Sequence, residues 1–245
     1  MRSEPERTGS PGQVLPWDSE FFGFRIGRLA LRRLTPETQQ AALAWAAAEK
    51  LRCAYFFADA DCPATLALAH EGGFKFIDLR MDFSTELAPA DDTTTTAGLR
   101  PATAADLPAI EALSRISHQD TRFSKDTNFP PARAAELYAE WIRRDFREHR
   151  ILVVPGANSG VAGYVTCQTD PGAGLGRIGL IAVAGSEQRR GVGRLLAAGA
   201  LAHFRQAGCR QARVATQASN VPAQRLYQSL GFRTAETCAT YHRWF

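Results

Sequence analysis

The stretch IGLIAVAGSEQRRGVG, residues 178–193, predicts an apolar strand that passes through a basic, glycine-containing turn directly into a helix. Gly191 and Gly193 have no Cβ, so backbone N–H groups there can approach a phosphate closely. The N-terminus of the following helix adds the positive end of its dipole at the same place, and Arg189, Arg190 and Arg194 add cationic donors. This order predicts a site for coenzyme phosphates, although an ordinary strand-to-helix turn has the same pattern.

A second stretch, RVATQASNVPAQRLYQSLGF at residues 213–232, predicts a strand, a polar turn, a helix and a Gly-Phe exit. Together the two stretches resemble the GNAT superfamily of acetyl-CoA-dependent N-acetyltransferases. The signature of that family is an apolar strand, four residues and then [QR]-x-x-G-x-[GA]. Residues 181–183, 184–187 and 188–193 meet this spacing without a gap. The resemblance implies an α/β fold with a mixed central sheet and two splayed strands that bind the coenzyme.

The resemblance also assigns the contacts with acetyl-CoA. The apolar strand is expected to align the pantetheine arm and the acetyl oxygen through the backbone of Ile181, Ala182 and Val183. The turn is expected to bind the pyrophosphate through Gln188, Arg189, Arg190, Gly191, Val192 and Gly193. Acetyl-CoA is the co-substrate, and no metal ion is expected.

Two residues of the second stretch match family positions with a chemical role. Asn220 matches an amide that contacts the pantetheine arm, although a turn or a helix N-cap explains it equally well. Tyr227 follows seven residues later, about two helical turns, and so returns to the same helix face. The resemblance makes Tyr227 the general acid that protonates the departing thiolate. The alternative for Tyr227 is packing within an amphipathic helix.

No general base stands out with similar clarity. Deprotonation of the acceptor amine needs a carboxylate or a histidine, acting directly or through water. Asp18, Glu20 and His118 are the candidates to test, and His118 also reads as an ordinary polar loop residue.

Composition limits the class of protein. The chain has 245 residues, of which 45% are hydrophobic and 22% charged, enough for one large or two small domains. No apolar run reaches the roughly 18 residues of a membrane span, and the polar start predicts no signal peptide. The five cysteines show no CxxC or metal spacing. We expect a cytoplasmic protein, and a net charge of +4 demands no nucleic-acid partner.

The predicted domains follow changes in composition and periodicity. They are a disordered N-terminus (1–13), a small α/β domain (14–88), a linker (89–98) and a GNAT domain (99–245). Helices are expected over 36–52, 63–72, 103–117, 131–146, 194–207 and 222–230. Strands are expected over 53–58, 74–86, 99–100, 151–154, 161–168, 177–183, 212–217 and 232–245.

The first domain repeats the pattern of the chain's end. A shift of 158 positions places Leu43 on Leu201 and Gly73-Phe74 on Gly231-Phe232, and the expected helices and strands coincide. The shift places residues 30–35, ALRRLT, on the turn 188–193, and no glycine remains there. We therefore expect a degenerate half-GNAT domain without a coenzyme, which shapes the acceptor site, although alanine-rich helices also match by chance.

The acceptor is suggested by two further stretches, residues 15–29 and 114–145. Both resemble GNAT enzymes that acetylate a nucleotide-linked 4-amino-4,6-dideoxygalactose, the dTDP-fucosamine acetyltransferases. In these, a domain with a W-x-x-x-F-F-G segment precedes a GNAT domain with an R-V-A-T-Q run. The turn at 188–193 follows the general GNAT spacing, where that group is expected to have a shorter loop.

The stretch 114–145 also carries side chains that suit a sugar nucleotide. Cations that could meet a diphosphate are Arg122, Lys125, Arg143 and Arg144, and aromatic rings that could stack on a base or sugar are Phe123, Tyr138 and Trp141. The alternatives are a core-facing stripe for Tyr138 or Trp141 and a solvated face for the adjacent arginines.

Three functions remain open from the sequence. The first is an N-acetyltransferase for an amino-sugar nucleotide, the second is the same chemistry on a peptide N-terminus or an antibiotic, and the third is a coenzyme-binding module without turnover. The presence of Tyr227 favours an enzyme. The resemblance implies a small-molecule acceptor and a homodimer, with no membrane partner.

Overall fold

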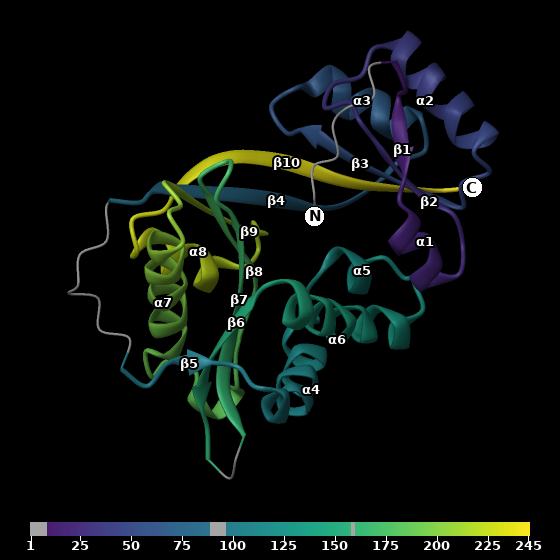
Figure 1. The fold of residues 1–245 in the computed structure, drawn as a ribbon. Coiled ribbons are helices and arrows are strands. Elements are labelled where there is room, and N and C mark those ends of the chain that lie inside the picture. Colours follow the sequence, from purple (N-terminus) through teal and green to yellow (C-terminus); the bar gives the residue numbers. More distant parts are fainter. Residues whose placement is uncertain (1–8, 89–96, 158–159) are drawn as a thin grey trace. The chain divides into compact units, whose positions relative to one another are not determined.

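The computed structural model describes residues 9–88, 97–157 and 160–245, which form two compact units (Figure 1). Unit 1 comprises the chain up to Arg80 together with Thr237–Phe245, and unit 2 comprises Met81–Glu236. These limits differ from the division expected from the sequence at two places. Residues 81–88 belong to unit 2 and not to the first domain, and the last nine residues belong to unit 1 and not to the second domain. Residues 1–8 and 89–96, in the expected disordered N-terminus and linker, lie outside the described residues.

Unit 1 places two helices on one face of a sheet. Its strand order is β1, β2, β3, β10 and then β4, with β2 parallel to β3 and β10 antiparallel to β3. Its elements are β1 (Gly12–Val14), α1 (Pro16–Phe22), β2 (Ile26–Leu29), α2 (Pro36–Ala48), β3 (Cys53–Asp59), α3 (Pro63–Glu71), the first half of β4 (Lys75–Glu86) and the end of β10 (Arg233–Trp244). The prediction of disorder is wrong where it overlaps β1.

Unit 2 is a mixed sheet covered on both faces. The strands of this unit follow the order β4, β9, β8, β7, β6 and β5. Its elements are β5 (Arg100–Pro101), a 3-10 turn (Ala104–Asp106), α4 (Leu107–Ser117), α5 (Arg122–Lys125), α6 (Pro131–Glu148), β6 (Arg150–Pro155), β7 (Val161–Asp170), β8 (Leu175–Val183), a second 3-10 turn (Gly185–Glu187), α7 (Val192–Gln206), β9 (Gln211–Gln217) and α8 (Val221–Gln228).

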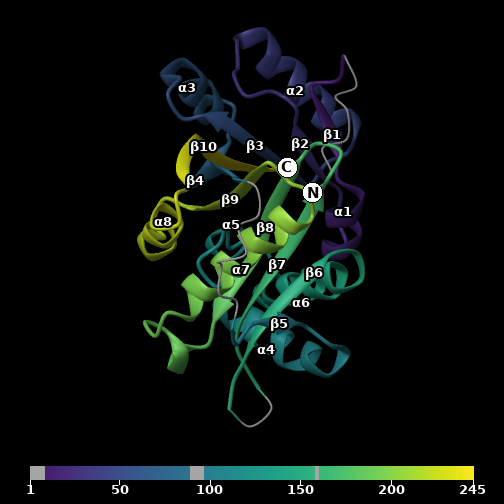
Figure 2. The ribbon, with the colours of Figure 1, turned by 60° about the vertical axis from the view of Figure 1, so that its left-hand side comes forward.

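Two apolar cores lie on the two faces of the unit 2 sheet. Helices α7 and α8 cover one face, and α4 and α6 cover the other (Figures 1 and 2). Phe204 and Tyr227 belong to the first core, whereas Ile142, Tyr164 and Ala182 belong to the second. The apolar positions of β8 alternate between these cores, as expected for a strand buried on both faces.

The predicted repeat is present in the secondary structure. A shift of 158 positions carries β3 onto β9 and β4 onto β10 with identical limits, and carries α3 onto the start of α8. Helix α7 begins two residues before the position that corresponds to the start of α2. The half-GNAT character of the first domain stays a prediction that is compatible with this correspondence.

The repeats exchange their last strands. In unit 1, β3 pairs with residues 238–244 of β10, which belong to the second repeat. In unit 2, Phe83 and Leu87 of the first repeat pack in the core beside β9, and the Leu87 N–H donates to the Arg210 carbonyl at 2.8 Å. Each unit is therefore completed by a strand from the other repeat.

Candidate functional site

Strands β8 and β9 separate halfway along their length. Their parallel register begins at Leu175 opposite Gln211 and ends at Ile178 opposite Val214. Beyond that point β8 continues to Val183 along β7, and no register pair joins it to β9 in the described residues. The separation confirms the expectation of splayed strands in the fold.

The splayed part of β8 directs backbone groups into the gap, where the Val183 carbonyl accepts a hydrogen bond from Gln188 Nε2 at 3.4 Å. The Ala184 N–H donates to the Ala162 carbonyl of β7 at 2.9 Å. Because neighbouring residues of a strand direct their N–H and C=O groups to opposite sides, the groups of Ala182 face β7 and those of Ile181 and Val183 face the gap. Such an edge can bind the amide groups of an extended ligand, as a further strand would.

A bulge in β8 lies at the point of separation. The pairing of β7 with β8 shifts between Val165 and Cys167, and the Leu180 N–H donates to the Thr166 hydroxyl at 2.9 Å. Gly179, beside the bulge, is exposed. Bulges of this kind re-aim the groups of a strand and are frequent next to active sites.

The turn after β8 leaves the N-terminus of α7 open. Arg189 (φ 60°) and Gly191 (φ 85°) adopt left-handed conformations, and no side chain of the described residues caps the helix. The first helical hydrogen bond joins the Leu195 N–H to the Gly191 carbonyl at 3.0 Å. The N–H groups of the first turn thus have no helical partner and suit a phosphate group.

The corresponding turn of the first repeat is closed by the protein itself. Thr35 caps α2 in a reciprocal pair of hydrogen bonds with Thr38, and the Leu34 N–H donates to a threonine hydroxyl. Arg33 forms an ion pair with Asp59 at 2.7 Å. These internal contacts engage groups that are open in the turn before α7, and the absence of a second coenzyme from this domain stays a prediction.

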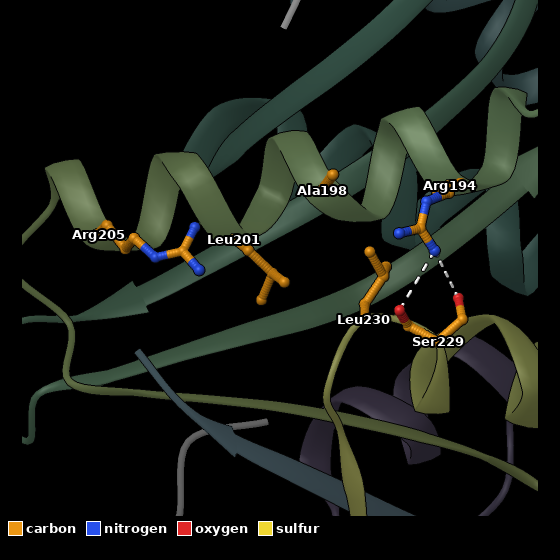
Figure 3. Close-up of a pocket in the computed structure, with 6 residues that line it drawn as sticks. All are labelled: Arg194, Ala198, Leu201, Arg205, Ser229 and Leu230. Carbon is orange, nitrogen blue, oxygen red and sulfur yellow. Dashed lines mark hydrogen bonds between the residues drawn. The ribbon is translucent and has the colours of Figure 1, made fainter. Parts of the chain in front are cut away.

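A groove of about 310 Å³ runs along the outer face of α7 (Figure 3). Its apolar wall is formed by Ala198, Leu201 and Leu230, and an arginine stands near each end, Arg194 and Arg205. The groove begins in the first turn of α7, beside the open N–H groups. Sequence reasoning missed it, because the α8 exit residues that form its second wall are distant along the chain.

Asn220 caps the helix that follows β9. Its Oδ1 accepts a hydrogen bond from the Ala223 N–H at 3.2 Å. The N-cap interpretation of this residue is therefore confirmed, and its predicted contact with the pantetheine arm stays a prediction. The side chain is half-buried, so its amide nitrogen can still meet a ligand.

Tyr227 lies in the core beneath α8. Its ring contacts Phe83 and Phe232, with centroids 6.0 and 5.8 Å away, and no described residue hydrogen-bonds its hydroxyl. Burial raises the pKa of Tyr227, so the phenol stays protonated at neutral pH. The packing alternative is thus present in the structure, and the predicted acid role is compatible with it.

The three candidate bases are divided between the two units. Asp18 and Glu20 belong to α1 of unit 1, and His118 follows α4 in unit 2. The His118 ring stacks on Tyr138, and its Nε2 lies 2.9 Å from the Tyr164 hydroxyl. Burial lowers the pKa of His118 to about 4, which makes the imidazole neutral and a weak base.

The predicted sugar-nucleotide contacts are largely engaged within unit 2. Arg143 pairs with Glu111, Glu136 and Glu140 at 2.5, 2.9 and 2.8 Å, and this raises its pKa. Tyr138 and Phe123 are buried in an aromatic cluster with Trp141. The expectation that Phe123 and Tyr138 stack on a ligand is therefore wrong, because both rings are buried in packing, and a ligand contact of the ion-paired Arg143 stays a prediction.

A carboxylate that sequence reasoning missed lies behind the splayed strand. Asp145 of α6 is 1% exposed, and a Cβ placed on Gly179 would lie 3.3 Å from its Oδ2. In the sequence, Asp145 reads as one of several charges on an amphipathic helix. Only its burial distinguishes it, and burial at this position depends on strands 20 to 35 residues further along.

The family comparison matches residues 112–232 to the acetyltransferase (GNAT) family. No curated protein sequence matches the chain. In the described residues, no helix is long and apolar enough to cross a membrane, and no cluster of His, Cys, Asp and Glu is arranged to hold a metal ion.

Solved structures show the same fold. A GCN5-related N-acetyltransferase from Sphaerobacter thermophilus is 15% identical, covering 95% of this chain and 76% of that chain, with a TM-score of 0.64. A tandem GNAT protein from the clavulanic acid biosynthesis pathway is 15% identical over 89% and 75% of the two chains, with a TM-score of 0.55. A glucosamine N-acetyltransferase region of a fungal multi-domain β-N-acetylglucosaminidase is 15% identical over 94% and 31%, with a TM-score of 0.59.

Proposed function

Because residues 112–232 form an acetyltransferase domain of the GNAT family, we propose that the protein acetylates the amine of an amino-sugar nucleotide. The protein is an N-acetyltransferase that uses acetyl-CoA, and the acceptor is the proposed part. The observation that carries the assignment of the site is the coincidence of the β8–β9 gap with the open N-terminus of α7. The acceptor that we propose resembles dTDP-4-amino-4,6-dideoxygalactose.

The residues of the turn fit the phosphates of acetyl-CoA. The N–H groups of Val192 and Gly193 and the side chains of Arg189 and Arg190 would bind the pyrophosphate. The N–H and C=O groups of Ile181 and Val183 would align the pantetheine arm and polarise the acetyl oxygen, while Gln188 and Ala182 support the turn and the strand. When bound, acetyl-CoA supplies a thioester carbonyl for attack by the amine.

The groove on α7 offers a place for the nucleotide end of the same co-substrate. Arg194 is near the pyrophosphate position, and Arg205 stands three helical turns further on. The apolar wall between them suits an adenine ring, and either guanidinium suits a phosphate. On the other side of the gap, Asn220 would contact the pantetheine arm, and Tyr227 would act as the general acid that protonates the thiolate.

The acceptor proposal rests on likeness rather than on contacts. Residues 15–29 and 114–145 resemble enzymes that acetylate an amino sugar attached to a nucleotide, and the fungal region of similar fold is named for glucosamine. Within unit 2, Arg122 and Lys125 are cations of this stretch that could meet a diphosphate, although Lys125 pairs with Asp120 at 3.0 Å and Arg122 lies over the Phe123 ring. The cytoplasmic location and the homodimer stay parts of this proposal.

A thiol-release assay tests the proposal. Acetyl-CoA is supplied with a panel of amines: amino-sugar nucleotides with the amine at different ring positions, free glucosamine, a peptide with a free N-terminus and an aminoglycoside. We expect the highest kcat/KM with a 4-amino-sugar nucleotide. Higher kcat/KM for the peptide or the aminoglycoside would replace the acceptor by the corresponding class and leave the acetyl-CoA site unaffected.

A further inference from the structure

At the point where β8 and β9 separate, one residue of β8 is exposed to solvent. Gly179 directly follows Ile178, the last residue of β8 that pairs with β9, and it is exposed. Four residues of strand, about 13 Å, separate it from Val183 at the entrance of the turn. An extended arm that enters at the turn and follows β8 therefore brings its far end to Gly179.

A side chain at this position would not fit. A Cβ on Gly179 would lie 2.5 Å from Thr166 Oγ1, 3.2 Å from Gln168 Nε2 and 3.3 Å from Asp145 Oδ2. A small polar wall made by α6 and β7 therefore lies directly against the glycine. Asp145 is the acidic group of that wall.

The Asp145 carboxylate is buried with few partners. Its side chain is 2% exposed, yet its closest polar contacts within the described residues are long, 3.5 Å to Gln168 Nε2 and 3.6 Å to a guanidinium nitrogen of Arg144. A buried carboxylate normally has several short hydrogen bonds, because burial removes its hydration. Unsatisfied capacity of this kind in a buried group calls for a partner, and the ammonium group of an acceptor would supply one.

We propose that Asp145 binds the ammonium group of the acceptor at Gly179 and takes its proton. The proposal rests on the N-acetyl transfer assigned above and adds the base that sequence reasoning left open. Asp145 lies on the α6 face of the sheet and Tyr227 on the α8 face, so the gap between β8 and β9 has a base on one face and an acid on the other.

The proton balance of the transfer uses both groups. The ammonium gives one proton to Asp145, and the neutral nitrogen attacks the thioester carbon. The new C–N bond forms as the C–S bond breaks, with the electron pair leaving on sulfur. Tyr227 protonates that sulfur and recovers the surplus proton of the new amide nitrogen, so one proton per turnover leaves through Asp145 to solvent.

Among the described residues that form this wall, Asp145 supplies the carboxylate. Tyr164 of β7 lies on the same face of the sheet as Asp145, whereas Cys167 lies in the core on the opposite face. Burial, and to a smaller extent the Asp145 charge, raises the pKa of both groups. Both groups therefore stay protonated at neutral pH. The nearest cation to the Asp145 carboxylate is Arg144, at 3.6 Å. His118 contacts the hydroxyl of Tyr164.

Steady-state kinetics of Asp145→Asn test the proposal. We expect kcat to fall by about 100-fold to 10,000-fold with the KM for acetyl-CoA unchanged, because general-base catalysis contributes that much. Glu148→Gln, an exposed carboxylate at the end of the same helix, is the matched control and should keep the wild-type kcat. Asp145→Ala should regain activity when formate is added, since a small carboxylate can enter the space left by the side chain.

The assay uses the amine of the panel that the wild type acetylates fastest, or the slow hydrolysis of acetyl-CoA if none is acetylated. Failure of every amino-sugar nucleotide therefore removes the proposed acceptor without touching Asp145. Wild-type kcat in Asp145→Asn would overturn the role of Asp145. Asp145→Glu keeps a carboxylate and shows whether a loss of activity in Asp145→Ala comes from the fold. The role of Asp145 would also be overturned if formate did not rescue Asp145→Ala and Asp145→Glu were inactive while it still bound acetyl-CoA.

Discussion

The guanidinium of Arg194 donates two hydrogen bonds to Ser229, one to the hydroxyl at 2.8 Å and one to the backbone carbonyl at 3.2 Å (Figure 3). This pair joins the first turn of α7 to the end of α8 at the mouth of the groove. Because Arg194 is exposed, the bonds contribute little to stability. They hold the guanidinium next to the proposed phosphate position.

Replacement of Arg194 should therefore affect the co-substrate more than the fold. We expect Arg194→Ala to raise the Kd of acetyl-CoA about tenfold, through loss of a charge-assisted hydrogen bond, with a change in Tm of no more than a few degrees. Isothermal titration measures the affinity. Ser229→Ala keeps the charge and should change the Kd much less; an equal effect of the two variants would mean that the contact acts through structure.

Removal of the Tyr227 hydroxyl tests the general acid. We expect Tyr227→Phe to lower kcat about 100-fold and to leave the Kd of acetyl-CoA unchanged. The fold should persist, since no described residue bonds to the hydroxyl and the ring contacts with Phe83 and Phe232 remain. Thiol release measures the rate, and unchanged turnover would reduce Tyr227 to a packing residue.

The left-handed backbone at Gly191 gives a prediction for the turn. A Cβ on Gly191 meets no atom within 4 Å, so Gly191→Ala costs only the strain of a positive φ, about 1–2 kcal/mol. Relaxation of that strain would move the N–H groups at the start of α7, and we expect weaker binding of acetyl-CoA. Gly185→Ala is the matched control, because Gly185 also has open space and has no positive φ; both thermal unfolding and affinity should stay at wild-type values.

Asp106 makes unit 2 sensitive to acid. The Arg100 guanidinium, at 2.7 Å, and hydrogen bonds from the Thr103 N–H and hydroxyl hold the pKa of this carboxyl well below its usual range. A lowered pKa in the folded state stabilises the protein above the unfolded pKa, about 3.9, and the contribution is lost as the pH falls through the folded value. We expect Asp106→Asn to cost about 1–3 kcal/mol at pH 7 and to flatten this acid dependence. Urea unfolding from pH 7 to pH 3 measures both, with Asp120→Asn as an exposed control.

The exchanged strand predicts where a C-terminal truncation acts. Removal of residues 237–245 leaves β3 without its antiparallel partner and removes Ala239 and Tyr241 from the unit 1 core. We expect rapid proteolysis within unit 1, while the unit 2 core, which contains none of these residues, resists. Limited proteolysis with mass spectrometry locates the cuts, and cuts confined to unit 2 would contradict the expectation.

Most elements of the fold were predictable from local patterns. The helices and strands from residue 36 onward lie within a few residues of their expected limits, apart from α5, since each carries its own periodicity and breakers. The region before residue 36 was missed: α1 is a single aromatic helix of seven residues, and β1 and β2 are too short to show alternation. Such elements are fixed by their neighbours in space.

The exchange of strands was not predictable for a different reason. Strands β4 and β10 occupy equivalent positions of the repeat and have the same length, so the pattern does not decide which of them pairs with β3. The phosphate-binding turn was visible because its residues are contiguous. Asp145 and the α7 groove were not, since their chemistry depends on burial and on walls that tertiary packing brings together.

The exchange also sets a constraint on synthesis. Unit 1 needs both its early strands and the last residues of the chain, so its sheet is completed only after all of unit 2 has been translated. At roughly 5–20 residues per second, the intervening stretch takes on the order of 10 s or more, during which the edge of β3 has no partner and can recruit other nascent strands. Yield in a recombinant host should therefore depend on chaperones that shield the early strands on the ribosome, and not on the stability of the finished enzyme alone.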